Sequence, residues 1–238
     1  MRIFLYLDFN TTTMTKILEI FRSIEAAKVI APEIDYSKYV PLNLSVTNPE
    51  LSQHKLKTAQ DYEIFIQKHL DKNDGKIAFG GYIETRNLYQ RSTVFKNNTT
   101  EERNIHIGLD LWINESATIH AALDGKIHSF QNNRALGDYG PTIILEHEVE
   151  GIKFHTLYGH LSEASLIEKK VGEVIRKGEQ IATLGLPPIN GDYAPHLHFQ
   201  IIIDMEEKTG DYPGVCSERT IAYYTNNCPN PNFLLKIM

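Results

Sequence analysis

The chain of 238 residues has little cysteine, no long apolar run and no excess of basic residues. Its two cysteines, Cys216 and Cys228, are too few for a disulfide framework, and they could form one bridge or stay as two reduced thiols. No stretch of about 18 apolar residues occurs, so we expect no membrane-spanning helix. The formal net charge is −6, from 24 basic and 30 acidic residues, which argues against nucleic acid as a partner.

The N-terminus also lacks the features of a secretion signal. Met1 to Asp8 contain one basic residue and a short apolar stretch that Asp8 interrupts, and no small-residue cleavage site follows. Met14 is a second possible start of translation. Because two reduced thiols are also the simpler interpretation of the cysteines, we expect a cytoplasmic location.

The most informative feature that is present is the tripeptide His196-Leu197-His198. Alternate residues of a β-strand point to the same face, so we expect both imidazoles to stand on one surface, with Gln200 continuing it. Leu197 and the apolar residues that follow at alternate positions would then face a core. Such a strand is a plausible half-site for a metal ion.

Two further segments carry the same kind of pattern. In Ile105-His-Ile-Gly-Leu-Asp-Leu-Trp-Ile113 the alternation predicts a strand with His106 and Asp110 on one face, and Gly108 between them leaves room for another group. In Thr156-Leu-Tyr-Gly-His-Leu-Ser162 we expect Tyr158 and His160 to share a face. Each pattern alone is weak, but two histidines and one aspartate would leave a coordination position open for water, as in catalytic zinc sites.

In combination these segments resemble the lysostaphin-type zinc metallopeptidases, many of which cut peptide cross-links in bacterial cell walls. The resemblance covers about Lys76 to Asp204 and rests on five blocks in the family's order. These blocks are His106-x-Gly-x-Asp110, Ala122-x-Asp-Gly125-x-Ile127, Tyr158-x-His160-Leu-Ser162, Gly172-x-x-Ile-x-Lys-Gly178-x-x-Ile181-x-x-x-Gly185 and His196-Leu-His198-Phe.

The resemblance implies one Zn²⁺ per chain, held by His106, Asp110 and His198, with His160 and His196 as catalytic histidines. Zinc on such a ligand set lowers the pKa of a bound water toward about 7, and the metal also polarises the scissile carbonyl. One histidine would take the proton and the other would hydrogen-bond the oxyanion, and the sequence leaves open which does which. No His-Glu-x-x-His helix is present, so the glutamate base of that protease class is missing.

Around these motifs the sequence predicts a mainly β (α+β) protein, with an antiparallel sandwich or barrel-like peptidase core. We expect an N-terminal helical extension over 1–75, the peptidase domain over 76–204 and a loop-rich tail over 205–238. The first predicted helix covers 12–30, and a second opens with a Thr58/Asp61 capping box and runs to about Leu70, with Ile64, Phe65 and Ile66 on its apolar face. Strands are expected at 77–83, 105–112, 117–120, 125–130, 142–149, 152–158, 180–184 and 197–203, with a hairpin turn at Glu150-Gly151. The extension would complete the fold or, alternatively, shield the groove.

The function predicted is a zinc metallopeptidase acting on a peptide or muropeptide substrate. Two alternatives remain, a non-catalytic peptide- or wall-binding module of the same fold, and a metal-dependent amidase acting on a cytoplasmic metabolite. Neither the scissile bond nor the oligomeric state follows from the residues. Tyr82, Arg86 and Tyr89 could steady an oxyanion or bind a peptide carboxylate, or could simply lie on a sheet surface. The remaining histidines match no ligand position and are expected to be surface or hydrogen-bonded residues: His54, His69, His120, His128, His147 and His155.

Overall fold

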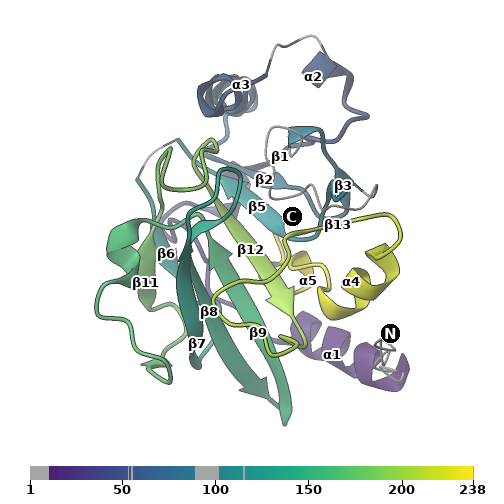
Figure 1. The fold of residues 1–238 in the computed structure, drawn as a ribbon, viewed down its shortest axis with the longest axis vertical. Coiled ribbons are helices and arrows are strands. Elements are labelled where there is room, and N and C mark those ends of the chain that lie inside the picture. The colour runs from purple at the N-terminus through teal and green to yellow at the C-terminus, as the bar shows by residue number, and fades with distance from the viewer. Residues whose placement is uncertain (1–10, 53, 55, 89–101, 115, 238) are drawn as a thin grey trace.

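The computed structural model describes residues 11–52, 54, 56–88, 102–114 and 116–237. Within this part the protein is mainly β, as the sequence predicts, and is built on one large sheet (Figure 1). The eight strands of the sheet, in spatial order, are β1 (Tyr39–Pro41), β2 (Ile77–Gly80), β5 (Leu109–Trp112), β12 (His196–Ile202), β9 (Ile152–Gly159), β8 (Gly140–Val149), β7 (Gly125–Asn133) and β10 (Val174–Ile175).

The sheet is mixed rather than purely antiparallel. β1 pairs in parallel with β2, whereas the other neighbours in the sheet run antiparallel. Its edges, β1 and β10, are not paired with each other among the described strands, so no closed barrel forms. Two small sheets accompany it, one of β6 (Thr118–His120) with β11 (Gln180–Thr183), and one of β13 (Val215–Cys216), β4 (Ile105–His106) and β3 (Glu84–Thr85).

The hairpin predicted at Glu150-Gly151 joins β8 to β9. Both residues have positive φ angles, +51° and +74°, which is the backbone that a two-residue turn with the twist of the sheet requires. Glycine adopts this conformation without a steric penalty, and the sequence therefore located this turn correctly.

The N-terminal segment differs from the prediction in two ways. α1 (Thr11–Ser23) ends earlier than expected, because residues 27–31 leave the helix and hydrogen-bond along β6 and the residues after it. Ala27 N–H donates to Ala122 O, His120 N–H donates to Val29 O, and Ile30 forms a bridge with Ile119. The short strand β1, which follows a 3₁₀ turn at Tyr36–Lys38, was not predicted. It is the edge strand of the main sheet, so residues before position 75 contribute to the same fold.

The second helix, α3 (Ala59–Lys72), begins where the capping box predicted. Thr58 Oγ1 accepts from Asp61 N–H while the Asp61 carboxylate accepts from Thr58 N–H, which satisfies two free amides of the first turn. Phe65 and Ile66 are buried, but Ile64 is 49% exposed and does not belong to the apolar face. A short helix, α2 (Pro49–Ser52), precedes α3.

The C-terminal tail is more regular than the predicted loops. It contains β13 and two short helices, α4 (Ile221–Asn227) and α5 (Asn232–Leu235), and α5 packs beside α1 (Figure 1). Cys216 and Cys228 are both buried and both free, so no bridge links them.

Strand β12 lies inside the main sheet and divides the molecule into a core side and a site side. Leu197, Phe199 and Ile201 are fully buried in the largest apolar cluster, which includes residues of α1 and α5. On the opposite face the order along the chain is Ala194, His196, His198, Gln200 and Ile202. Ala194 and Ile202 belong to two different apolar clusters, so the polar residues between them lie between two packed regions. Among the described helices, none is both long and apolar enough to cross a membrane.

Candidate metal and catalytic site

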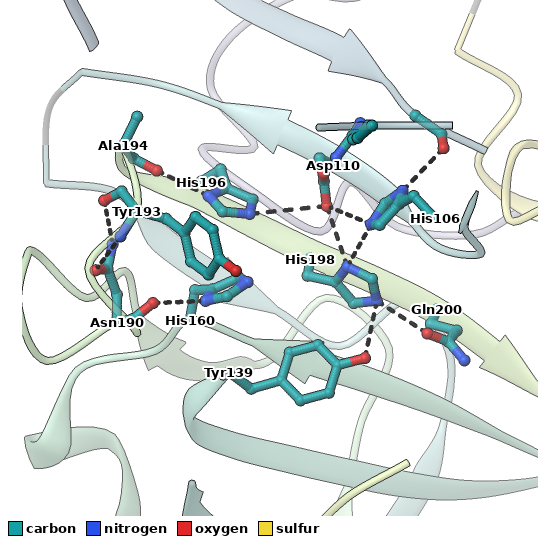
Figure 2. A network of polar contacts seen from close by, with 12 residues as sticks. His106, Asp110, Tyr139, His160, Asn190, Tyr193, Ala194, His196, His198 and Gln200 are labelled. Carbon is teal, nitrogen blue, oxygen red and sulfur yellow. Dashed lines mark hydrogen bonds and ion pairs between the residues drawn. The ribbon is translucent and has the colours of Figure 1, made fainter. Parts of the chain in front are cut away.

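The structure brings His106, Asp110 and His198 together although they come from three strands. His106 ends β4, Asp110 lies in β5 and His198 lies in β12 directly opposite Asp110. His106 Nε2 is 2.9 Å from His198 Nδ1, and Asp110 Oδ1 is 3.3 Å from the first atom and 3.1 Å from the second (Figure 2). All three side chains are buried.

The break between β4 and β5 is a departure from the single strand predicted over 105–112. β4 pairs with β3 and β13, whereas β5 pairs with β2 and β12, so the chain changes sheets at Ile107 and Gly108. Gly108 is needed here because a Cβ at this position would lie 2.3 Å from His198 Cε1. The space that the sequence predicted beside Gly108 is thus filled by the imidazole of His198.

The protonated nitrogen of each imidazole in this cluster follows from its outer partner. His106 Nδ1 lies 2.8 Å from Gly81 O, a carbonyl that can only accept, so Nδ1 carries the proton and Nε2 presents a lone pair. His198 Nε2 lies 2.9 Å from Gln200 Oε1. The amide of Gln200 is oriented by its own Nε2, which donates to Pro213 O at 3.1 Å, so Oε1 faces His198 and leaves Nδ1 with the lone pair.

The carboxylate of Asp110 is oriented by an ion pair. Arg86 Nη1 donates to Asp110 Oδ2 at 2.6 Å, and Arg86 Nε donates to Glu84 Oε2 at 2.7 Å. Burial by itself would raise the pKa of Asp110, but His106 and Arg86 outweigh it and hold that pKa well below its usual value. Asp110 is therefore ionised, and its Oδ1 faces the two histidines.

Three lone pairs thus converge within 3.3 Å with no proton of these groups between them. Such an arrangement is repulsive unless a cation lies among the three atoms. Ligand atoms of a tetrahedral zinc ion, at 2.0–2.2 Å from the metal, lie about 3.4 Å from one another, close to the distances found here. The cluster is the one group in the described part of the chain in which three or more His, Cys, Asp or Glu ligand atoms converge. The donor set therefore fits a divalent metal with nitrogen and oxygen ligands.

His160 and His196 lie beside this cluster, with their rings 4.2 Å apart (Figure 2). His160 Nδ1 donates to Asn190 O at 2.7 Å, and His196 Nδ1 donates to Ala194 O at 2.8 Å. In both rings Nε2 therefore bears the lone pair, and His196 Nε2 lies 3.8 Å from Asp110 Oδ1. Burial lowers the pKa of both histidines, and that of His160 falls well below its usual value. Both are neutral near pH 7 and able to accept a proton.

The predicted common face of Tyr158 and His160 is wrong. Tyr158 points into the core, where it packs on Phe199 and its hydroxyl accepts from Ala122 N–H. His160 follows the end of β9 with a left-handed φ of +63°, which turns its side chain to the site. The alternation of a strand does not continue through such a residue. Gly159 does admit a close neighbour, because a Cβ there would lie 2.7 Å from the Tyr139 ring.

The other residues considered from the sequence have different surroundings. Arg86 is buried in the site, but the Tyr82 hydroxyl donates to Cys228 O, and Tyr89 lies outside the described residues. Trp112 stacks on His196 with ring centroids 5.7 Å apart. His120 bonds to Gly178 O and Thr118 Oγ1 and does not line the cavity at the site.

Several residues of the site were not assigned a role from the sequence. The Tyr139 hydroxyl oxygen lies 3.4 Å from His198 Nε2. The backbone carbonyl of Asn190 orients His160, and the side-chain amide of Gln200 orients His198. Gln200 carried a partial signal, because it continues the face of the two histidines. Tyr139 and Asn190 stand in irregular segments whose positions no periodicity could reveal.

Comparison with known proteins agrees with these motifs. Residues 104–209 match the peptidase family M23. An uncharacterized metalloprotease of Haemophilus influenzae is 32% identical over 120 residues, which is 49% of this chain and 23% of the relative. The chain thus spans less than a quarter of that relative's length.

Two solved structures of bacterial proteins are similar to part of the chain. The catalytic domain of lysostaphin from Staphylococcus simulans is 25% identical, covers 51% of this chain and 80% of its own, and has a TM-score of 0.36. Csd3 of Helicobacter pylori is 27% identical, covers 43% of this chain and 24% of its own, and has a TM-score of 0.33. The match to peptidase family M23 covers residues 104–209, which contain all five sequence blocks, and it confirms the resemblance to the lysostaphin-type metallopeptidases.

Proposed function

We propose that this protein is a zinc-dependent peptidase that hydrolyses a peptide amide bond, with a muropeptide as one candidate substrate. The observation that carries the proposal is the convergence of three oriented lone pairs from His106, Asp110 and His198 beside two neutral histidines. Two imidazoles and one carboxylate leave the fourth position of a tetrahedral site open, as in catalytic zinc centres.

Zinc bound by His106 Nε2, Asp110 Oδ1 and His198 Nδ1 would supply Lewis acidity to the scissile carbonyl and a water of lowered pKa. His160 and His196 act on the protons. Because Nδ1 of each is tied to a backbone carbonyl, only Nε2 is free to exchange a proton with the reacting groups. One Nε2 accepts the proton of the attacking water and then gives it to the leaving amine, and the other, protonated from solvent, donates a hydrogen bond to the oxyanion.

Arg86 and Gln200 support this chemistry without contacting substrate atoms. Arg86 keeps Asp110 ionised and fixes which carboxylate oxygen faces the histidines. Gln200 keeps His198 in the tautomer that presents Nδ1. Both partners are buried, so solvent does not compete for these hydrogen bonds.

The proposal is tested by measuring bound metal and peptide cleavage together. The purified full chain is reconstituted with zinc, its metal content is measured, and peptide and muropeptide libraries are incubated with and without a chelator. We expect one zinc per chain and cleavage that the chelator abolishes. A chain that does not bind zinc after reconstitution would contradict the proposal, and binding of wall peptides without cleavage would indicate a binding module.

The two histidines are tested separately by His160→Ala and His196→Ala. General acid–base catalysis contributes about 10²–10⁴-fold, so each variant should lose activity in that range while retaining zinc. The variant that lacks the base should also lose the acidic limb of the pH profile of kcat/KM, because that limb reports protonation of the base. Full turnover in either variant would remove that residue from the mechanism.

We also propose a cytoplasmic location, supported by the two free thiols. Cys216 and Cys228 lie in one apolar cluster, yet they remain unbridged. Unpaired neighbouring thiols are typical of a reducing compartment. Cell fractionation with an antibody to the chain tests this, and recovery from the culture medium or the periplasm would contradict it.

A further inference from the structure

A cavity of about 210 Å³ lies over the candidate site, and its lining is apolar at one end. This end, which we call the apolar subsite, is formed by Leu44, Ala59, Tyr62, Ile66, Trp112 and Ala194. None of these side chains is charged. Elsewhere the lining includes charged residues such as Arg103, Asp138 and Asp211. Apart from Ala59, the apolar residues belong to one packed cluster, so the cavity wall is not chemically uniform.

The apolar subsite adjoins the catalytic candidates directly. Trp112 lies opposite His196 in the pairing of β5 with β12, and their rings are stacked with an interplanar angle of 25°. Ala194 lies two residues before His196 and provides the carbonyl that orients it. A side chain in the subsite therefore belongs to a substrate residue close to the bond that is cleaved.

Most of this wall comes from outside the M23 domain of residues 104–209. Leu44 follows β1, while Ala59, Tyr62 and Ile66 come from α3. α3 is fixed in place: Asn114 Nδ2 donates to Gln67 Oε1 at 2.7 Å, and His69 Nε2 lies 2.9 Å from Pro41 O. Phe65 and Ile66 pack with Leu42 and Trp112 in one cluster. The subsite is thus a built feature of this chain rather than a part of the family domain.

Arg86, whose guanidinium lies over the Trp112 ring, also lines the cavity. Its guanidinium is engaged by Asp110 and Glu84, so its charge is balanced within the protein. A charged substrate side chain would lose its hydration here without gaining a partner, whereas an apolar one gains by leaving water.

We infer that the apolar subsite binds a bulky aliphatic or aromatic side chain of the substrate residue next to the scissile amide. The inference rests on the proposed peptidase function and narrows its substrate class. It favours peptides with leucine, isoleucine or phenylalanine at that position over peptides of glycine and alanine. Residues of the N-terminal segment would then determine the specificity of a catalytic centre that lies in the M23 domain.

The test uses the zinc-loaded full chain and acetylated pentaglycine amides in which one glycine at a time is replaced by leucine, phenylalanine or aspartate. Cleavage products are identified by mass spectrometry. We expect leucine or phenylalanine at one position to raise kcat/KM at least about tenfold over glycine, since even one methylene in an apolar pocket contributes this much. Aspartate at that position should give no gain. Equal or faster cleavage of the all-glycine peptide would overturn the inference.

Two variants assign the preference to the subsite. Ala59→Phe fills the cavity and should remove the preference for leucine over glycine. Tyr62→Ala enlarges the cavity and should shift the preference toward phenylalanine. Ile64→Ala is the matched control, because Ile64 is on the same helix but 49% exposed. A preference that persists in Ala59→Phe, in a variant that still binds zinc, would place the selectivity elsewhere.

Failure of the proposed function can be distinguished from failure of the subsite. If no peptide is cleaved, the same leucine and glycine peptides are titrated into the full chain by calorimetry. Tighter binding of the leucine peptide by about tenfold, abolished in Ala59→Phe and kept in Ile64→Ala, would support the subsite without peptidase activity. Equal binding of the two peptides would overturn it.

Discussion

The two faces of strand β12 are stabilised in different ways. On the core face, Leu197, Phe199 and Ile201 are fully buried among apolar side chains. Their contribution to stability depends on close packing and not on the orientation of any particular neighbour. On the site face, His196, His198 and Gln200 are buried as well, but each polar atom has a specific partner. The core face therefore determines stability, whereas the site face depends on the orientation of individual hydrogen-bond donors and acceptors.

The same difference separates the two histidines of the tripeptide. His196 is oriented through Nδ1 by a backbone carbonyl, and His198 is oriented through Nε2 by the Gln200 side chain. Opposite ring nitrogens are therefore left with lone pairs. Two identical side chains on one face thus present different ring nitrogens to the site, as the different tasks proposed for them require.

The largest expected effect is on the site face. His198→Ala should abolish zinc binding and peptidase activity, because one of three converging lone pairs is lost. The stability of the metal-free protein should change far less, since repulsion among these lone pairs is relieved. Equilibrium dialysis against zinc and urea unfolding of the metal-free variant check the two parts. Zinc binding as tight as in the wild type would contradict the proposed ligand set.

On the core face, Phe199→Ala should lower the free energy of unfolding by about 3–5 kcal/mol. Phe199 is fully buried and packs on Tyr158 at a ring distance of 5.3 Å, so truncation leaves a cavity. Urea unfolding of the metal-free protein measures the loss, and Phe199→Leu is the conservative control. A decrease of less than about 1 kcal/mol in the free energy of unfolding would contradict the view that the core face stabilises the fold by close packing.

His147, a buried histidine away from the site, should make the free energy of unfolding depend on pH. Burial lowers the pKa of His147 to about 4, although its Nδ1 donates to Asp124 O and its Nε2 accepts from Thr156. Between pH 6.5 and 4 the unfolded chain binds this proton first, so the free energy of unfolding falls as the pH falls through that window. His147 contributes at most about 3 kcal/mol to the fall.

The measurement is urea unfolding of the metal-free wild type and of His147→Gln at several pH values from 7.5 to 4. The difference between the two proteins isolates His147 from the histidines of the site. The variant should show a shallower decline. Parallel curves would mean that His147 is protonated without cost in the folded protein.

The smallest effect concerns the outer partner on the site face. Gln200→Leu removes the acceptor of His198 Nε2–H and should weaken zinc binding about 10- to 100-fold. Gln200→Glu restores an acceptor for His198 and should recover part of the affinity, although it loses the donor to Pro213 O. Competition with a chromophoric chelator measures both. An unchanged affinity in Gln200→Leu would show that Gln200 does not position the ligand.

Much of the fold could be predicted from local pattern. Period-two alternation located most strands of the main sheet, and the capping box located α3, because both signals depend on neighbouring residues. The errors occur where tertiary pairing overrides the pattern. Residues 27–30 were expected to continue the first helix but instead hydrogen-bond beside β6, and the segment 105–112 divides between two sheets at Gly108.

The sequence by itself determined which residue types are available to ligate a metal or to move a proton, and the order of its motifs indicated the family that they resemble. The tertiary structure alone determined how they are oriented. The Gly81 carbonyl, the Gln200 amide and the Arg86 ion pair come from distant segments, and the left-handed turn at His160 breaks the alternation. The apolar subsite likewise joins α3 to β5. Ligand identity is a property of single residues, but tautomer, ionisation and pocket shape depend on contacts that exist only once the chain has folded.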